Sequence, residues 1–194
     1  MDLKYTGERQ IPATPGTIEG IDIKHIERYK WASVFTYNKR VYDIACGVGY
    51  GSLLLKAGEY SGYDNSQETI EYAKEYYSKK LKVKFFAADA YNMPDLPVAD
   101  VVVSFETIEH LEKPDAFLAW CSHHGEILVI SSPIKNSFAR SKFHLFEYRL
   151  NEFSEALKKH FSNIEMFIQK NDLGIIYPCK KPDDKGVAIA ICQR

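Results

Sequence analysis

Glu106, Glu109 and His110 have the residue types and the spacing of a small metal or acid–base site. If the chain is helical here, positions i, i+3 and i+4 share one face, so two carboxylates and an imidazole point the same way. Such a set can hold one divalent ion, such as Mg²⁺. The alternative is that His110 acts as a plain base, because histidine titrates near neutral pH. The spacing therefore predicts either a metal site or a general base.

A glycine-rich segment at 43–51 (D-I-A-C-G-V-G-Y-G) follows a short apolar run and precedes a helical pattern. Glycine lets the backbone turn tightly and approach a ligand closely, and a helix N-terminus behind it favours negative charge. Asp64 ends the next apolar run, where an acid can accept both hydroxyls of a ribose. The loop and the acid together are typical of a nucleotide site; the alternative for Asp64 is a simple helix cap.

The spacing of the glycines and a second acid narrow the choice of nucleotide. Dinucleotide oxidoreductases use G-x-G-x-x-G, whereas this loop has G-x-G-x-G and contains neither lysine nor arginine for a pyrophosphate. Asp89, followed by Ala90, comes directly after the third apolar run, where a carboxylate can accept the exocyclic amine of adenine. The predicted ligand is an adenosine that carries a cationic amino-acid tail.

Apolar runs alternate with helical patterns along the chain, which predicts an α/β, Rossmann-like fold. We expect seven strands in a mostly parallel sheet, with an antiparallel C-terminal hairpin and helices on both faces. The chain is expected to form a single domain, with an irregular arm (1–17), a helix (18–37) and a core (41–194). The strands are expected at 41–45, 60–64, 83–88, 100–105, 126–132, 164–169 and 187–192.

His144 follows a polar loop after the fifth predicted strand. This loop lies at the carboxyl end of the sheet, where ligands bind in open α/β folds. We therefore expect His144 to be a base on the substrate side if no metal is present, with a structural histidine as the alternative.

Composition and charge exclude several classes of protein. The chain has 194 residues, is 45% hydrophobic and 26% charged, and carries a net charge of -1. This near-neutral balance argues against a nucleic-acid partner, and no apolar run is long enough to predict membrane insertion. The four cysteines form no C-x-x-C pair, and the first residues do not resemble a signal peptide. We expect a cytoplasmic protein, monomeric or homodimeric.

These features resemble class I S-adenosylmethionine-dependent methyltransferases, most clearly over residues 41–132. Within that class, the stretches T-G-E-R (6–9), Y-G-S (50–52) and S-F-E-T-I-E-H-L (104–111) resemble one subgroup. Its members occur in bacterial polysaccharide and O-antigen clusters and are similar to sugar O-methyltransferases. The resemblance thus implies S-adenosyl-L-methionine as cofactor and a small-molecule or glycan acceptor.

The resemblance also implies roles in binding the cofactor. Gly47 and Gly49 would approach the methionine moiety. Asp64 would bind the ribose, and Asp89 with Ala90 would face the adenine. Arg28 could pair with the methionine carboxylate or form a surface salt bridge, and Arg9 could do the same or anchor the arm. The implied cofactor residues are Arg28, Asp43, Gly47, Gly49, Asp64, Asn65, Asp89, Ala90, Phe105 and Glu106.

The E-x-x-E-H spacing is similar to the metal-binding motif of ubiquinone-pathway O-methyltransferases and small-RNA 2′-O-methyltransferases. The RNA enzymes add a downstream histidine, for which His144 is the candidate. The implied ligands of a divalent ion are Glu106, Glu109, His110 and His144. Without a metal, His110 and His144 are the candidate catalytic residues.

The expected activity is methylation of a hydroxyl on a sugar, glycan or related small molecule. The alternatives are a methyltransferase acting on nitrogen or another small molecule, and a non-catalytic protein that binds S-adenosylmethionine. N-methyltransferases of nucleic-acid bases often carry N-P-P-Y where this chain has F-E-T-I (105–108), which disfavours methylation of a base. The chain shows no inserted substrate domain, so the acceptor should be covered by the arm, the 135–144 loop and the 174–185 loop.

Overall fold

The computed structural model of the chain describes residues 3, 7, 9–79, 82–137, 141–170, 174–181 and 185–194. Thr6 and Glu8 of the T-G-E-R stretch lie outside these residues. No helix in the described part is long and apolar enough to cross a membrane.

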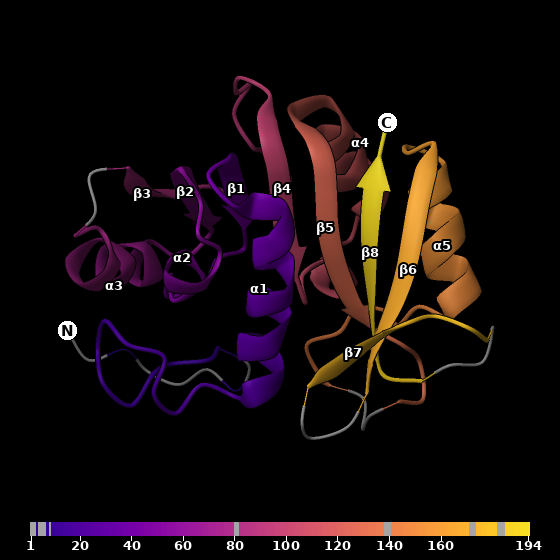
Figure 1. The fold of residues 1–194 in the computed structure, drawn as a ribbon, viewed down its shortest axis with the longest axis horizontal. Helices are drawn as coiled ribbons and strands as arrows, with labels where there is room; N and C mark the ends of the chain where they lie inside the picture. The colour runs from indigo at the N-terminus through magenta and orange to yellow at the C-terminus, as the bar shows by residue number, and fades with distance from the viewer. Residues whose placement is uncertain are drawn as a thin grey trace.

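One mixed sheet of eight strands, counted over the described residues, forms the centre of the molecule in the order β3-β2-β1-β4-β5-β8-β6-β7 (Figure 1). The five strands from β3 to β5 in this order pair in parallel, and β8, β6 and β7 add to them antiparallel. The strands are β1 (Arg40–Ile44), β2 (Glu59–Asp64), β3 (Val83–Ala87), β4 (Ala99–Phe105), β5 (Gly125–Pro133), β6 (Asn163–Lys170), β7 (Ile175–Pro178) and β8 (Val187–Gln193).

The strand count corrects the expected seven. β7 lies in a segment that the sequence predicts to be a loop, because it holds Gly174 and Pro178 close together. Proline cannot donate to a ladder, but it is tolerated on an edge strand. β7 pairs on one side with β6 and forms the edge of the sheet.

Helices cover both faces of the sheet. α1 (Ile23–Thr36), α2 (Gly51–Leu54) and α3 (Gln67–Tyr77) lie on the face toward the viewer in Figure 1, and α4 (Pro114–His124) and α5 (Leu150–Lys158) lie behind it. Each face has its own hydrophobic core. β4 separates them, since Val101 and Val103 pack into one core and Val102 into the other. The A-D-V-V-V-S-F run is apolar because it is buried on both sides.

The start of the first helix differs from the expected one. α1 begins at Ile23 rather than 18, because Gly20 turns with a φ of 79° and Asp22 caps the helix by accepting from the Lys24 N–H. α4 runs on to His124, so the histidine pair at 123–124 forms its last turn. α3 starts directly after Ser66, whose hydroxyl caps the helix by accepting from the Thr69 N–H.

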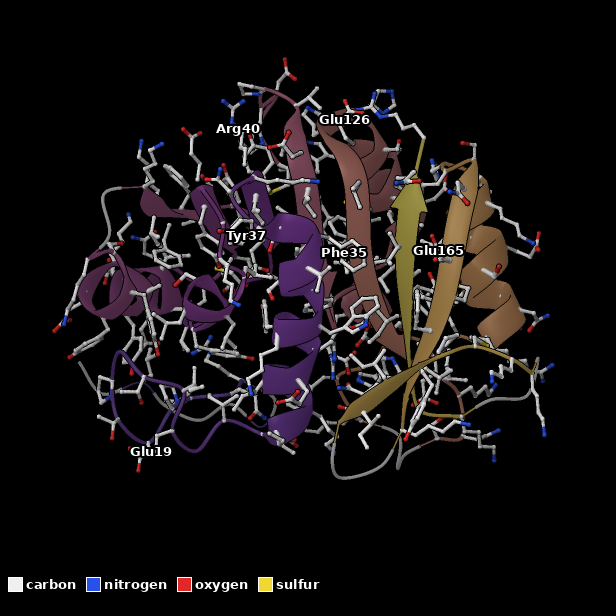
Figure 2. All side chains as sticks on the ribbon, viewed as in Figure 1. Glu19, Phe35, Tyr37, Arg40, Glu126 and Glu165 are labelled. Atoms are coloured by element: carbon white, nitrogen blue, oxygen red, sulfur yellow. The ribbon has the colours of Figure 1, made fainter. Side chains whose placement is uncertain are left out.

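The amino and carboxyl ends of the parallel strands lie at opposite ends of the molecule. Arg40 and Glu126 stand at the amino ends of β1 and β5, and the arm residue Glu19 lies at the opposite end of the molecule (Figure 2). The carboxyl ends of β1, β2, β4 and β5 all lie on the arm side, so the predicted site residues that follow these strands share one edge.

Candidate functional site

Two adjoining cavities of about 450 and 220 Å³ lie at the carboxyl edge of the sheet. Five residues line both of these cavities, so we treat the cavities as two lobes of one site: Ala45, Asp64, Asn65, Glu106 and His110. The larger lobe is completed by Arg9, Gln10, His25, Tyr29, Cys46, Gly47, Tyr50, Phe105, Glu109 and His144. The smaller lobe holds Asp89 and Ala90, as expected for an adenine pocket.

The loop glycines Gly47 and Gly49 serve different purposes. Gly47 has a φ of 56°, and a Cβ there would meet nothing within 4 Å, so its backbone opens onto the cavity. Gly49 has a φ of 91°, and a Cβ there would lie 2.7 Å from Cε1 of Phe85. Gly49 is therefore required for packing against the core, and of the two glycines only Gly47 is in the described lining of the cavity.

Asp64 is held in place by the backbone on both sides of it. Its Oδ2 accepts from the Gly47 N–H and its Oδ1 from the Ser66 N–H, each at 3.0 Å. Burial raises the pKa of Asp64, and these two hydrogen bonds, together with Arg9, act against that rise. Each oxygen keeps capacity for a second donor. The carboxylate is thus fixed between the lobes, where it can accept the two hydroxyls of a ribose.

Asp43 lies beneath the loop and is not in the described lining of either lobe. The side chain is fully buried and accepts from the hydroxyls of Tyr60 at 2.7 Å and Tyr29 at 3.2 Å. Burial raises the pKa of Asp43 to about 7. A Cβ on Gly51 would come within 2.9 Å of its Oδ2. Asp43 therefore supports the loop from below.

Arg28 and Glu106 form an ion pair, with 2.9 Å between Nη1 and Oε1. Arg28 is only 2% exposed and is absent from the described lining of the cavity. This burial corrects the surface salt bridge expected as one of its two roles, whereas the expected contact with the methionine carboxylate stays a prediction. Glu106 does line the cavity, but it precedes the short 3-10 helix η1 (Ile108–His110) and has a left-handed φ of 51°. It therefore does not share the face of Glu109 and His110, because the turn is not an α-helix through all three.

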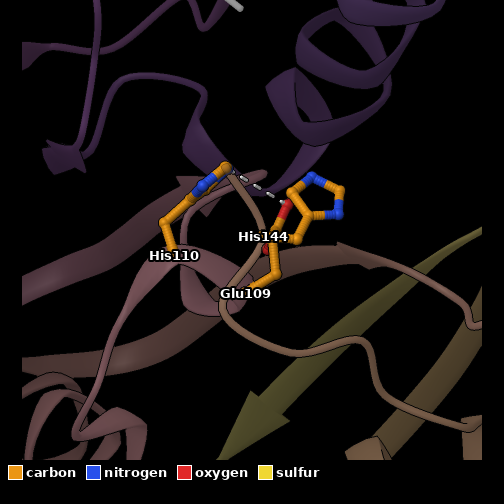
Figure 3. A group of neighbouring side chains, drawn as sticks. All are labelled: Glu109, His110 and His144. Atoms are coloured by element: carbon orange, nitrogen blue, oxygen red, sulfur yellow. Dashed lines mark ion pairs between the residues drawn. The ribbon is translucent and has the colours of Figure 1, made fainter. Parts of the chain in front are cut away.

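Glu109, His110 and His144 come together at the floor of the larger lobe (Figure 3), with one ligand atom from each lying within 4.8 Å of the others. Three of the four implied metal ligands thus gather, and Glu106 is engaged by Arg28 instead. Glu109 and His110 come from η1, and His144 comes from the chain after β5. The Leu145 N–H donates to the carbonyl of Glu109 at 3.0 Å, which holds the two segments together.

Glu109 is the buried carboxylate of this group. Its Oε2 accepts from the Ser132 hydroxyl at 3.2 Å, whereas its Oε1 makes no hydrogen bond with any described residue and lies 3.9 Å from Nε2 of His110. Burial, and then the neighbouring Glu106, raise the pKa of Glu109 well above its usual value. A buried oxygen without a donor is costly, so this position suits a cation.

Neighbouring groups orient the two imidazoles. Nδ1 of His110 lies 3.1 Å from the carbonyl of Phe143 and must donate to it, which turns Nε2 toward Glu109. The His144 ring meets the His110 ring edge-on, with centroids 5.0 Å apart. Nδ1 of His144 lies 3.5 Å from the Glu147 carboxylate. The group is therefore built as an acid–base or metal-binding cluster.

His25 is a site residue that the sequence pattern did not indicate. It lines the larger lobe from α1, and its Nδ1 lies 3.4 Å from the Tyr50 hydroxyl. Burial, and then Arg28, lower the pKa of His25 to about 4, so the ring is neutral at physiological pH. The i, i+3, i+4 spacing of His25, Arg28 and Tyr29 could have indicated a polar helix face turned toward the sheet.

The cover of the site follows the expectation in part. Arg9 and Gln10 of the arm and His144 of the loop after β5 line the larger lobe. A Cβ on Gly7 would lie 3.2 Å from the Phe143 ring, so the arm contacts that loop. Residues 174–181 and 185 contribute nothing to the lining of either lobe.

Comparison with known proteins agrees with this geometry. A family model described as a methyltransferase domain matches residues 41–124. A probable S-adenosylmethionine-dependent methyltransferase of Mycolicibacterium smegmatis is 27% identical over 167 residues, which cover 80% of this chain. The chain spans about 64% of the length of that relative.

Solved structures share the fold at low identity. The methyltransferase domain of bacterial CtHen1-CN has a TM-score of 0.68 at 18% identity, covering 89% of this chain and 100% of that one. The magnesium protoporphyrin IX methyltransferase of Synechocystis PCC 6803, with bound S-adenosylhomocysteine, has a TM-score of 0.65 at 14% identity, covering 89% and 84%. Residues 41–124, which hold the glycine loop and its acidic partners, thus match a methyltransferase domain, and the chain shares the fold of such structures. The similarity to S-adenosylmethionine-dependent methyltransferases indicates S-adenosylmethionine as the cofactor.

Proposed function

We propose that the protein transfers the methyl group of S-adenosylmethionine to a hydroxyl oxygen of a sugar, glycan or related small molecule. We further propose that Glu109, His110 and His144 hold a divalent ion, such as Mg²⁺, beside that hydroxyl. The observation that carries the proposal is the hydrogen-bond-deficient Oε1 of Glu109, buried beside two imidazoles in the cavity that also holds Asp64 and Gly47.

The donor set supports a hard or borderline cation. One carboxylate and two imidazoles suit several divalent ions and leave coordination positions for other ligands. A bound cation would offset the cost of burying the ionised Glu109 carboxylate next to Glu106. A bound ion lowers the pKa of a coordinated hydroxyl. This is the step that an oxygen acceptor needs and that an amine acceptor does not.

The chemistry asks little else of the protein. The cofactor supplies a methyl group on a positively charged sulfur, which becomes a neutral thioether when the methyl group moves in line to the acceptor. The chain must align the acceptor oxygen and exclude water. Arg9, Gln10 and the His144 loop cover the cavity and would do both. The proton of the hydroxyl must leave to a base or to solvent.

The second candidate is a hydroxyl methyltransferase that uses His144 as a plain base. It is favoured by the Glu147 carboxylate 3.5 Å from Nδ1 of His144. A carboxylate in this position orients an imidazole and stabilises its protonated form. In this case Glu147 would matter for catalysis, and a metal would not.

The test combines binding and product analysis. We expect wild-type protein to bind Mn²⁺ in calorimetric titration, and Glu109→Gln and His144→Ala to lose that affinity by about 10- to 100-fold. His123→Ala is the matched control, because His123 is exposed in the last turn of α4. Labelled methyl transfer to a panel of sugars, other hydroxyl compounds and amines would then identify the accepting atom.

Three outcomes separate the candidates. Absence of Mn²⁺ and Mg²⁺ binding, with activity lost in Glu147→Gln, would favour the plain base. Methylation of amines with no methylation of hydroxyl compounds would contradict the oxygen acceptor. Failure of wild-type protein to bind S-adenosylmethionine or S-adenosylhomocysteine would contradict the proposed activity as a whole.

A further inference from the structure

Arg28 is a buried cation whose described contacts all lie inside the protein. Nη1 contacts Oε1 of Glu106 at 2.9 Å and donates to the Ser131 hydroxyl at 3.2 Å, while Nε donates to Oε1 of Gln169 at 3.0 Å. The guanidinium carbon lies 5.8 Å from the centre of the Phe105 ring. Arg28 therefore ties α1 to β4, β5 and β6 just behind the cavity wall.

Gln169 shows that this contact is built into the fold rather than made by a mobile surface side chain. It is 2% exposed, and its Nε2 donates to the carbonyls of Lys24 and Gly174 at 2.9 Å. Its remaining amide oxygen is thereby aimed at Arg28. The amide thus fixes both the beginning of α1 and the guanidinium that α1 carries.

Glu106 is the group that this network holds at the cavity. The Ser131 hydroxyl donates to Oε1 of Glu106 at 2.8 Å and accepts from the Glu106 N–H at 3.1 Å, so one serine fixes both side chain and backbone. The φ of 51° is unfavourable for a residue other than glycine, and such strain persists where the surroundings enforce it. Both described side-chain contacts are to Oε1, and Glu106 lines both lobes, so Oε2 is the oxygen that can meet a ligand.

We infer that Glu106 binds the α-ammonium group of the cofactor's amino-acid tail and that Arg28 is the positioning residue that holds Glu106 oriented for it. The inference rests on the cofactor assignment. An ammonium group carries three N–H donors that a carboxylate can accept, whereas a sulfonium carries none. Arg28 acts through Glu106 rather than on the tail, because it lies behind the described lining of the cavity.

Three ligands that differ in the amino-acid tail and in the charge of the sulfur can test this inference. S-adenosylmethionine has the tail and a charged sulfur, S-adenosylhomocysteine has the tail and a neutral sulfur, and 5′-methylthioadenosine has a neutral sulfur and no tail. Their affinities are measured by calorimetry with wild-type protein and with the isosteric variant Glu106→Gln. We expect both tailed ligands to bind about 10- to 100-fold more weakly to the variant, and 5′-methylthioadenosine to stay within about twofold.

Arg28→Met should shift the affinities in the same pattern. Arg28→Lys should recover part of the loss, because lysine restores the positive charge but not the planar set of guanidinium N–H donors. Ser131→Ala keeps both charges and tests the same network if Arg28→Met does not fold, as judged by circular dichroism without ligand. Glu126→Gln is the control, since Glu126 is exposed at the opposite end of β5 (Figure 2).

The results that would contradict the inference can be distinguished from one another. Equal weakening of all three ligands would mean that the network is merely structural and would overturn the inference. Loss of S-adenosylmethionine alone would assign Glu106 to the sulfonium, and unchanged affinities would remove it from the site. Failure of wild-type protein to bind any of the three would contradict the cofactor assignment instead.

Discussion

Asp64 and Glu109 are carboxylates on the same edge of one sheet, and their surroundings differ. Asp64 accepts two backbone N–H groups at 3.0 Å, and its neighbour Asp43 accepts from two tyrosine hydroxyls. Glu109 accepts from one serine, and its second oxygen has no hydrogen bond with the described residues. The Asp64 side, which we propose as the cofactor half, thus has a fully hydrogen-bonded carboxylate, whereas the Glu109 side, which we propose as the acceptor half, holds a buried carboxyl oxygen without a donor.

The two halves also differ in how they are assembled. The cofactor half is local, because the loop after β1 and the acid after β2 are joined by the Gly47 N–H. The acceptor half depends on segments distant in sequence, since Leu145 and Phe143 hold their loop onto Glu109 and His110. We expect substitutions in the first half to act mainly on the cofactor and those in the second on a metal or acceptor.

The largest expected effect is that of Asp64→Ala. It removes the acceptor for the ribose hydroxyls and releases the Gly47 and Ser66 N–H groups, so S-adenosylhomocysteine should bind at least about 100-fold more weakly. Calorimetric titration measures this, with the exposed Asp95→Ala as control. Wild-type affinity in Asp64→Ala would break the assignment of the cofactor half.

The two loop glycines should separate stability from binding. Gly49→Ala places a methyl group against Phe85 in a left-handed conformation and should cost about 2 kcal/mol of unfolding free energy. Gly47→Ala should cost only about 1 kcal/mol, because its Cβ meets no atom within 4 Å, but the methyl group should weaken cofactor binding. Urea unfolding and calorimetry on both variants test the contrast. Equal losses of stability would contradict it.

Glu109→Gln should change the unfolding free energy in the direction opposite to that of the two glycine substitutions. Without metal, the variant should be more stable than wild type by about 1 kcal/mol at neutral pH, because it replaces a buried carboxyl group whose ionisation is opposed by burial and by Glu106. Excess Mn²⁺ should raise the melting temperature of wild type and leave the variant unchanged. Thermal unfolding with and without the ion checks both. A destabilised variant that still responds to Mn²⁺ would contradict the difference proposed between the surroundings of Asp64 and Glu109.

The smallest expected effect is a dependence of stability on pH. Because the folded pKa of Asp43 is raised to about 7, its protonated form favours the folded state, and that stabilisation is lost as pH rises through 7. The stability should therefore fall by about 1 kcal/mol between about pH 6.5 and 8. His25, whose folded pKa is lowered to about 4, acts below this window and in the opposite direction.

The raised pKa of Glu109 adds a loss of the same sign as that of Asp43, so Asp43→Asn separates the two. Urea unfolding at several pH values should show a shallower slope for this variant than for wild type. An unchanged slope would mean that Asp43 is ionised throughout and that the loop rests on a charge.

The amino-acid sequence by itself determined the parallel core, the glycine loop and the acids after β2 and β3. These features are local: apolar runs form strands, glycines mark the turn after β1, and Ser66 caps α3. β7 was not predictable, because a four-residue edge strand containing proline carries no pattern of its own. It exists because β6 offers it a ladder.

Tertiary structure alone decided what the polar residues of the site do. From sequence, Glu106 and Glu109 are equivalent ligands, but Arg28 pairs with the first and leaves the second beside two histidines. From sequence, Arg28 could meet the methionine carboxylate or form a surface salt bridge, and the pattern does not indicate His25 as a site residue. Packing buries Arg28 behind the cavity and turns His25 into it. The pairing of charges in a buried site depends on which distant segments meet, and spacing along one segment does not contain that information.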